Sequence, residues 1–89
     1  MYEIITKREL APKIKLFKVK APDIAAKANP GQFVILVMGE KGERVPLTIA
    51  DYDAGEGSIK FAFNEVGKTT KQMGCFKEGD FIQEIVKKV

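Results

Sequence analysis

The segment QFVILVMGEKGERVPLTIAD, residues 32–51, carries the strongest evidence for the fold. Residues 32–38 form a nearly continuous apolar run, with apolar side chains throughout 33–37, which is typical of a strand buried on both faces. The glycines and charged residues at 39–42 predict a hairpin turn, and residues 44–51 predict the returning strand. Pro46 lies inside that second strand. Because proline has no N–H, we expect the strand to be at an edge, or locally open, at this point.

Outward from this hairpin, the sequence consists of short strand patterns separated by turns. Strands are predicted over 2–10, 13–21, 58–66 and 81–86, a short helix near 69–76, and one helical turn over 24–28 with Asp23 as its cap. The apolar residues of 13–21 change phase midway, which indicates a bulge or a bend between sheets. Together these elements predict an all-β fold, a small six-stranded antiparallel Greek-key β-barrel with one short helix, formed by residues 1–89 as a single domain.

Composition excludes several classes of function. The chain has 89 residues, 45 % of them hydrophobic, which suits one globular domain. No apolar run is long enough to span a membrane and no secretory signal is visible, so we expect no membrane association. The single cysteine, Cys75, cannot form an internal disulfide, which favours a reducing cytoplasm.

Charge and residue types narrow the chemistry further. The 15 basic and 12 acidic residues are interleaved rather than gathered into a basic stripe, so nucleic acid is not an expected partner. With no histidine and one cysteine, we expect no metal in this chain. A Ser-His-Asp or Cys-His nucleophile system is excluded because its base is missing.

The segment Arg44–Thr48 combines groups that suit a planar ligand bearing a phosphate. An opened strand leaves backbone N–H and C=O groups free, and Leu47 could lie against a ring face. Thr48 offers a hydroxyl and an N–H to a ring nitrogen or carbonyl. Arg44 could bind a phosphate through paired hydrogen bonds. The alternative is an edge strand with a solvated arginine.

The segment Gly67–Thr70 has the features of an anion site. A glycine followed by hydroxyl residues at a helix start aims several N–H groups at one point, where the helix dipole favours negative charge. Thr69 or Thr70 could cap the helix or contact a phosphate oxygen, and Lys68 would add charge. The segment lacks the first glycine of a Walker A sequence. A capped helix without a ligand is the alternative.

Four segments in this order resemble the flavin-binding domain of the ferredoxin–NADP reductase superfamily. They are Pro30–Val34, Gly42–Asp51, Val66–Lys71 and Lys77–Asp80. The resemblance covers nearly the whole chain and is strongest to two relatives. One is the electron-transfer subunit of dihydroorotate dehydrogenase, and the other is the small subunit of NADH-dependent ferredoxin:NADP oxidoreductase, also called sulfide dehydrogenase.

Two positions depart from the wider superfamily pattern. Leu47 stands where many members have an aromatic residue against the flavin. Val45 stands where their arginine falls, with Arg44 one place earlier. This form is normal in the matched branch, so the resemblance still implies FAD, with FMN as the alternative cofactor.

The resemblance also implies roles for individual residues. Residues 45–48 would line the flavin ring and ribityl chain, with Thr48 near N5 of the ring. Residues 63–64 would approach the adenosine side, and residues 67–70 would receive the diphosphate. The implied cofactor-binding residues are Arg44, Val45, Pro46, Leu47, Thr48, Phe63, Asn64, Gly67, Lys68, Thr69 and Thr70.

The function implied by the resemblance is that of an FAD-binding domain in an oxidoreductase. It would pass electrons between NAD(P)H and an iron–sulfur partner such as ferredoxin. Relatives continue into a nicotinamide-binding domain and a cysteine-held [2Fe–2S] centre, which residues 1–89 lack. We therefore expect other domains or subunits to supply them, and little activity of the chain alone. No side chain resembles a general acid or base, and a homodimer is one way to cover an exposed half-cleft.

Two other functions remain open from the sequence. A flavin-free barrel could act as a protein-interaction module, with Pro46 and Leu47 in a contact patch. An oligonucleotide-binding barrel would need exposed aromatic residues beside basic ones, whereas Phe61 and Phe63 alternate as core residues.

Overall fold

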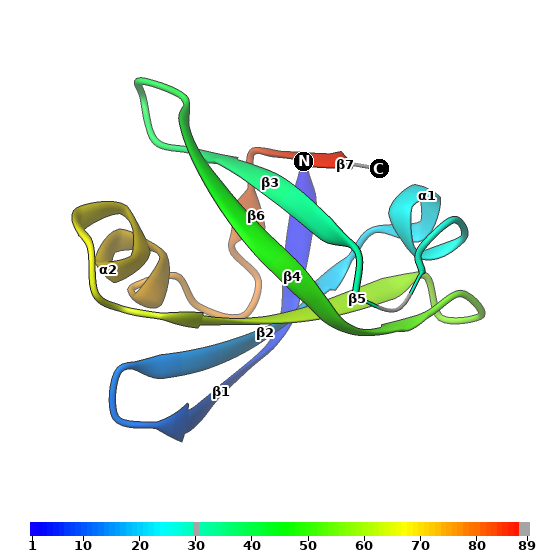
Figure 1. Ribbon diagram of the computed structural model, residues 1–89, viewed down its shortest axis with the longest axis horizontal. Coiled ribbons are helices and arrows are strands. Elements are labelled where there is room, and N and C mark those ends of the chain that lie inside the picture. Colours follow the sequence, from blue (N-terminus) through cyan, green and yellow to red (C-terminus); the bar gives the residue numbers. More distant parts are fainter. Residues whose placement is uncertain (30, 88–89) are drawn as a thin grey trace.

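In the part of the chain that the structure describes, one antiparallel sheet of seven strands curls into a nearly closed barrel with two short helices (Figure 1). The structure is a computed structural model that describes residues 1–29 and 31–87, so Pro30 of the first matched segment lies outside the described residues. The strands are β1 (Tyr2–Ala11), β2 (Ile14–Lys20), β3 (Phe33–Met38), β4 (Glu43–Asp53), β5 (Ser58–Asn64), β6 (Phe81–Ile82) and β7 (Glu84–Lys87), and the helices are α1 (Pro22–Ala25) and α2 (Lys68–Gly74).

The strand order confirms the all-β barrel and corrects the strand count. The order is β6-β1-β2-β5-β4-β3-β7, so β2 lies beside β5 in a Greek-key arrangement. The predicted single strand 81–86 is broken at Gln83, which gives seven strands instead of six among the described residues. The part before Gln83 pairs with β1 and the part after it pairs with β3. This change of partner brings the two edges of the sheet together. The alternation of polar and apolar residues along one segment shows which face is buried, but it does not show which strand becomes its neighbour.

The helices differ from the prediction in number and in capping. The described residues form two short helices, not one, because the turn predicted over 24–28 is the helix α1, which starts at Pro22. Ala21 is its N-cap residue, so Asp23 lies in the first turn and does not cap it. Pro22 suits this position because the first turn of a helix needs no N–H from it. Within residues 1–29 and 31–87, neither helix is long and apolar enough to cross a membrane.

The core fills the inside of the barrel. Phe17 of β2 packs edge-on against Phe61 and Phe63 of β5, with ring centroids 6.0 and 5.0 Å apart. All three are buried, which confirms the inward assignment of the β5 aromatic residues. Such aromatic pairs contribute about 0.5–1.5 kcal/mol beyond the area that they bury.

The strand β3 is buried on one face only, which corrects the expectation for residues 33–37. Val34 and Leu36 are fully buried, whereas Phe33 is 44 % exposed and Ile35 is half-buried. The reason is that the other face of β3 lies on the outside of the barrel, where its residues are exposed or only partly buried. The apolar run over 33–37 therefore includes residues of the outer face as well as residues of the buried face.

The register shifts lie in β1 and, at Ala50, in β4, and not in the strand predicted over 13–21. The pairing of β2 with β5 runs without a shift from Ile14 to Lys20. The shifts in β1 occur in its pairing with β2, where Ile5 and Leu10 of β1 are the extra residues. The apolar residues of β2 change phase because Ile14 and Leu16 lie half-buried on the outer face, whereas Phe17 and Val19 are in the core.

Candidate functional site

The first half of β4 has an open edge. Residues 43–48 pair with β3 on one side, whereas pairing with β5 begins only at Ile49. The two strands diverge from that point, and α2 lies near the gap between their ends (Figure 1). Pro46 lies in this open stretch, as expected for a strand that is locally unpaired.

The backbone of β4 presents alternate groups to this open edge. The N–H of Ile49 donates to the carbonyl of Gln32 at 2.8 Å, so it points toward the β3 side. Because N–H directions alternate along a strand, the N–H groups of Arg44 and Thr48 point to the open side. Pro46 also has its nitrogen on that side, so the missing N–H costs no hydrogen bond with β3. The open edge can therefore bind the polar rim of a planar ligand.

The side chains of residues 44–48 divide between two faces. Arg44, Pro46 and Thr48 are exposed on the outer face, and within the described residues neither the guanidinium of Arg44 nor the hydroxyl of Thr48 has a hydrogen-bond partner. Val45 is 8 % exposed and belongs to the core, so only its backbone is available to a ligand in this conformation. Leu47 packs against the edge of the core and remains half-exposed, as a residue under a ring would.

The start of α2 is stabilised by its own threonine. The N–H of Gly67 donates to Oγ1 of Thr70 at 3.0 Å, and the hydroxyl of Thr70 lies 3.1 Å from the carbonyl oxygen of Gly67. The carbonyl of Gly67 also accepts from the N–H of Lys71 at 2.9 Å, which closes the first turn. Thr70 is therefore a capping residue, and its hydroxyl is already used within the helix start.

The second threonine is also engaged. The hydroxyl of Thr69 donates to the carboxylate of Glu43, which lies at the beginning of β4. The groups that remain for an anion are the ammonium of Lys68 and the N–H groups of the first turn, because such N–H groups have no partner inside a helix. Neither the N–H of Lys68 nor that of Thr69 bonds to another described residue.

The bond between Glu43 and Thr69 shows that the two predicted segments meet in space. Beside it lies a hollow of about 410 Å³, lined by residues of the β3–β4 turn, the start of β4 and α2: Gly39, Glu40, Lys41, Glu43, Lys68 and Gln72. Arg44 is adjacent to Glu43, and Thr48 lies four residues further along the strand, about 13 Å away at the usual rise. An elongated ligand along β4 would have its phosphate end at α2 and its ring end at Thr48.

The end of β5 contributes less than expected. Phe63 is 4 % exposed and packs against Phe17, so its ring is a core element. Asn64 is exposed at the end of the strand. Of this pair, Asn64 is the residue whose side chain can reach a ligand.

The other end of α2 is held by residues that sequence reasoning did not identify. The ammonium of Lys7 donates to the carbonyl of Gly74 at 2.6 Å. Glu65 lies against Gly74, where an added Cβ would be 1.8 Å from its carboxylate, and it pairs with Lys15 at 2.6 Å. Buried Met73 completes the anchor. No local pattern marks these residues, because their partners come from distant strands.

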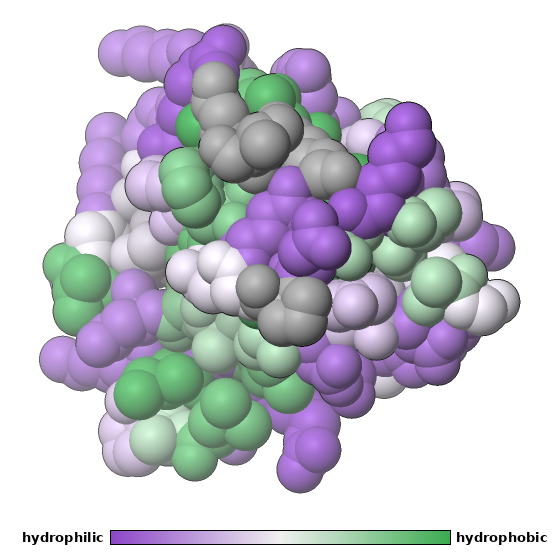
Figure 2. All heavy atoms as spheres, turned by 45° about the vertical axis from the view of Figure 1, so that its right-hand side comes forward, coloured by the Kyte–Doolittle hydropathy of each residue, from purple (hydrophilic) through white to green (hydrophobic). Residues whose placement is uncertain are grey.

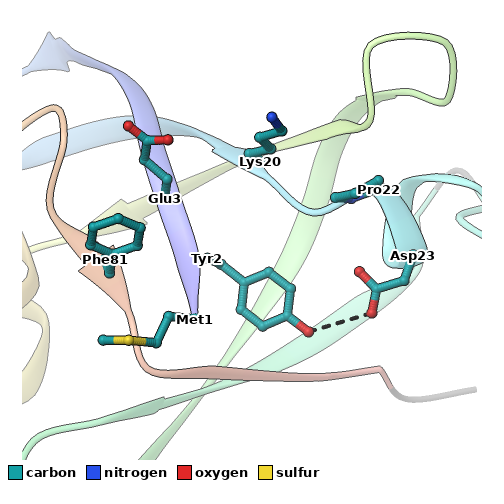
Figure 3. Close-up of a pocket in the computed structure, with 7 residues that line it drawn as sticks. All are labelled: Met1, Tyr2, Glu3, Lys20, Pro22, Asp23 and Phe81. Carbon is teal, nitrogen blue, oxygen red and sulfur yellow. Dashed lines mark hydrogen bonds between the residues drawn. The ribbon is translucent and has the colours of Figure 1, made fainter.

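A second pocket lies at the N-terminal end of β1, between β6 and α1 (Figure 3). The hydroxyl of Tyr2 donates to the carboxylate of Asp23 at 3.5 Å, and burial and this carboxylate raise the pKa of Tyr2. The pocket contains none of the predicted cofactor-binding residues, and its lining residues are Met1, Tyr2, Glu3, Lys20, Pro22, Asp23 and Phe81. Among the described residues, no cluster of three His, Cys, Asp or Glu side chains is arranged to hold a metal.

Comparison with known proteins adds sequence relatives and a structural neighbour. No family model matches the chain. An uncharacterised protein of Clostridium beijerinckii, encoded in the adh 3′ region, is 49 % identical over 86 residues, which cover 97 % of this chain and 29 % of that protein. The dihydroorotate dehydrogenase B (NAD(+)) electron transfer subunit homolog of Thermotoga maritima is 42 % identical over 84 residues, 94 % of this chain and 30 % of that protein.

A solved structure is similar to this chain in fold as well as in sequence. It is that of an NADH-dependent reduced ferredoxin-NADP oxidoreductase, studied for flavin-based electron bifurcation, with a TM-score of 0.92 and 41 % identity. The match covers 97 % of this chain and 31 % of the other. The chain therefore spans about three tenths of the relatives it matches, and over that part it is similar to them in sequence and fold, consistent with the ferredoxin–NADP reductase superfamily that its motifs resemble.

Proposed function

We propose that this chain is the FAD-binding barrel of an oxidoreductase that passes electrons between NAD(P)H and an iron–sulfur partner such as ferredoxin. The observation that carries the proposal is the open edge of β4, where Arg44 and Thr48 present free groups and the strand meets the start of α2. Two of the relatives are named as a dihydroorotate dehydrogenase B electron transfer subunit or its homolog, and these names support the proposal.

The proposed site assigns each part of the cofactor to groups on this chain. The ring lies beside Thr48 and Leu47 at the open edge, where the N–H and hydroxyl of Thr48 reach its polar rim. The diphosphate binds Arg44, Lys68 and the N–H groups of the first turn of α2. Asn64 lies toward the adenosine, which is the part that distinguishes FAD from FMN. The flavin would supply the redox chemistry, and the chain would hold and orient it.

The electron donor and acceptor bind elsewhere in this proposal. We propose that other domains or subunits supply the nicotinamide-binding and iron–sulfur parts, and the match to only about three tenths of each relative's length supports this. We propose that the protein works in the cytoplasm, in line with its single exposed cysteine, Cys75. A homodimer would cover the open side of the cleft.

A flavin-free interaction module is the second candidate, and one observation favours it. Phe33 and Pro46 are exposed on the outer face of β3 and β4, beside half-buried Ile35.

An oligonucleotide-binding barrel is less well supported, because Phe61 and Phe63 are 0 % and 4 % exposed. Figure 2 also shows hydrophilic residues spread over one face between hydrophobic areas rather than gathered in one region.

A flavin titration tests the proposed function. The purified chain is titrated with FAD and with FMN, and quenching of flavin fluorescence is followed for wild type, Thr48→Ala and Thr6→Ala. Thr6 is a half-buried threonine of β1 away from the open edge, and serves as the matched control. We expect micromolar FAD binding that Thr48→Ala weakens about fivefold, the loss of one hydrogen bond, and Thr6→Ala leaves unchanged. Absence of binding at about 100 µM FAD would favour the interaction module.

A further inference from the structure

We infer that Glu43 competes with the diphosphate of the cofactor for the start of α2, and so lowers the affinity of the barrel for phosphate-bearing flavins. This inference rests on the proposed function. The carboxylate of Glu43 accepts the hydroxyl proton of Thr69, a residue 26 positions later in the chain. Glu43 is half-buried, so this contact is partly shielded from water.

The competition follows from counting protons. A threonine hydroxyl has a single proton to donate, and a diphosphate oxygen is an acceptor, as a carboxylate oxygen is. While Thr69 donates to Glu43, it cannot donate to a phosphate. A diphosphate at this place would also lie beside the negative charge of Glu43, and like charges at short range repel.

The backbone geometry allows the carboxylate to yield without unfolding. Residue 43 is fixed in β4 by its pairing with Met38, so only the side chain has to rotate away. The hollow beside the contact is also lined by Lys41, which can receive the displaced carboxylate while Lys68 binds the diphosphate. Glu43 is thus an internal anion that holds the start of α2 while the diphosphate is absent.

The same hollow offers a matched control. Glu40 also lines it and has the same charge, but it is exposed and makes no hydrogen bond within the described residues. Glu43→Gln and Glu40→Gln therefore remove equal charge from one region, and only the first changes the contact with Thr69.

The experiment titrates wild type and both variants with three probes. FAD carries ring and diphosphate, riboflavin carries the ring alone, and inorganic pyrophosphate carries the diphosphate alone. Flavins are followed by fluorescence, and pyrophosphate by the amide NMR shifts of residues 67–71. We expect Glu43→Gln to bind FAD and pyrophosphate about tenfold more tightly, with riboflavin unchanged and Glu40→Gln gaining less than about twofold.

The other outcomes separate this inference from the proposed function. If both variants gain the same affinity for FAD and pyrophosphate, Glu43 acts only through its charge, as Glu40 does, and the inference is overturned. Weaker FAD binding by Glu43→Gln would also overturn it, since Glu43 would then be positioning Thr69 for the ligand. If no variant binds a flavin but Glu43→Gln binds pyrophosphate more tightly, the inference stands and the proposed function fails.

Discussion

Single residues at the start of α2 show how one side chain type serves two purposes. Thr69 and Thr70 are adjacent and chemically identical, yet Thr70 caps the helix while Thr69 bonds to a carboxylate of another strand. A hydroxyl in a sequence does not say which of these it does. The structure therefore changes the expected effect of removing Thr70 from loss of a phosphate contact to loss of a cap.

We predict that Thr70→Val lowers the free energy of unfolding by about 1 kcal/mol, the usual effect of removing a capping hydroxyl. Valine keeps the branched shape of threonine and removes only the hydroxyl. Urea unfolding followed by circular dichroism measures the change, and Thr70→Ser serves as the control that retains the bond. Equal stability of the valine and serine variants would contradict the capping role.

At the scale of elements, α1 is held against the turn between β4 and β5. The N–H of Ala21 donates to the carbonyl of Gly57 at 2.8 Å, and Gly57 has a φ of +77°. A Cβ added at Gly57 would lie 2.9 Å from Cβ and 3.2 Å from Cα of Pro22. The close approach of the turn to the start of α1 therefore requires glycine for space as well as for backbone conformation.

Gly39 provides the comparison needed to test this packing. It also has a φ of +77°, but an added Cβ would meet nothing within 4 Å. We predict that Gly39→Ala costs about 1 kcal/mol for its backbone conformation, and that Gly57→Ala costs a further 1–3 kcal/mol for overpacking. Thermal unfolding of the two variants gives the difference. If both lose the same stability, the contact with Pro22 does not constrain the turn.

At the scale of the whole molecule, Lys15 joins three parts of the barrel. Its ammonium on β2 lies 3.0 Å from Glu9 on β1 and 2.6 Å from Glu65, just after β5. The hydrogen bond to Glu65, followed by that to Glu9, raises the pKa of Lys15 above its ordinary value of 10.5. Burial, and then the charge of Asp23, raise the pKa of Tyr2 above 10.0.

These shifts predict a loss of stability in strong alkali. A group whose pKa is raised by folding stabilises the native state below its ordinary pKa, and this contribution disappears as the pH rises through the folded pKa. The midpoint of thermal unfolding should therefore be flat up to about pH 9.5 and fall above about pH 10.5. Lys15→Met and Tyr2→Phe should each flatten this fall. An unchanged slope in both variants would assign alkaline unfolding to other groups.

Much of this architecture was predictable because its causes are local. The spacing of Ile59, Phe61 and Phe63 at every second position indicates a strand with one buried and one solvent-facing side. The glycine-rich turns show where one strand ends and the next begins. The missing N–H of Pro46 restricts its strand to an open edge whatever lies around it. The failures, such as the break at Gln83, concern which strand becomes a neighbour, and that choice depends on closure of the sheet.

The sequence by itself determined the barrel class, the open strand at Pro46 and the helix start after Gly67, because steric limits and hydrogen-bonding capacity act within a few residues. Only the tertiary structure decided which groups near the proposed ligand remain free. It assigned Thr69 to Glu43 and left the guanidinium of Arg44 without a partner among the described residues. Hydrogen-bond partners are chosen by distance in space, and residues 26 positions apart become neighbours only when the barrel forms.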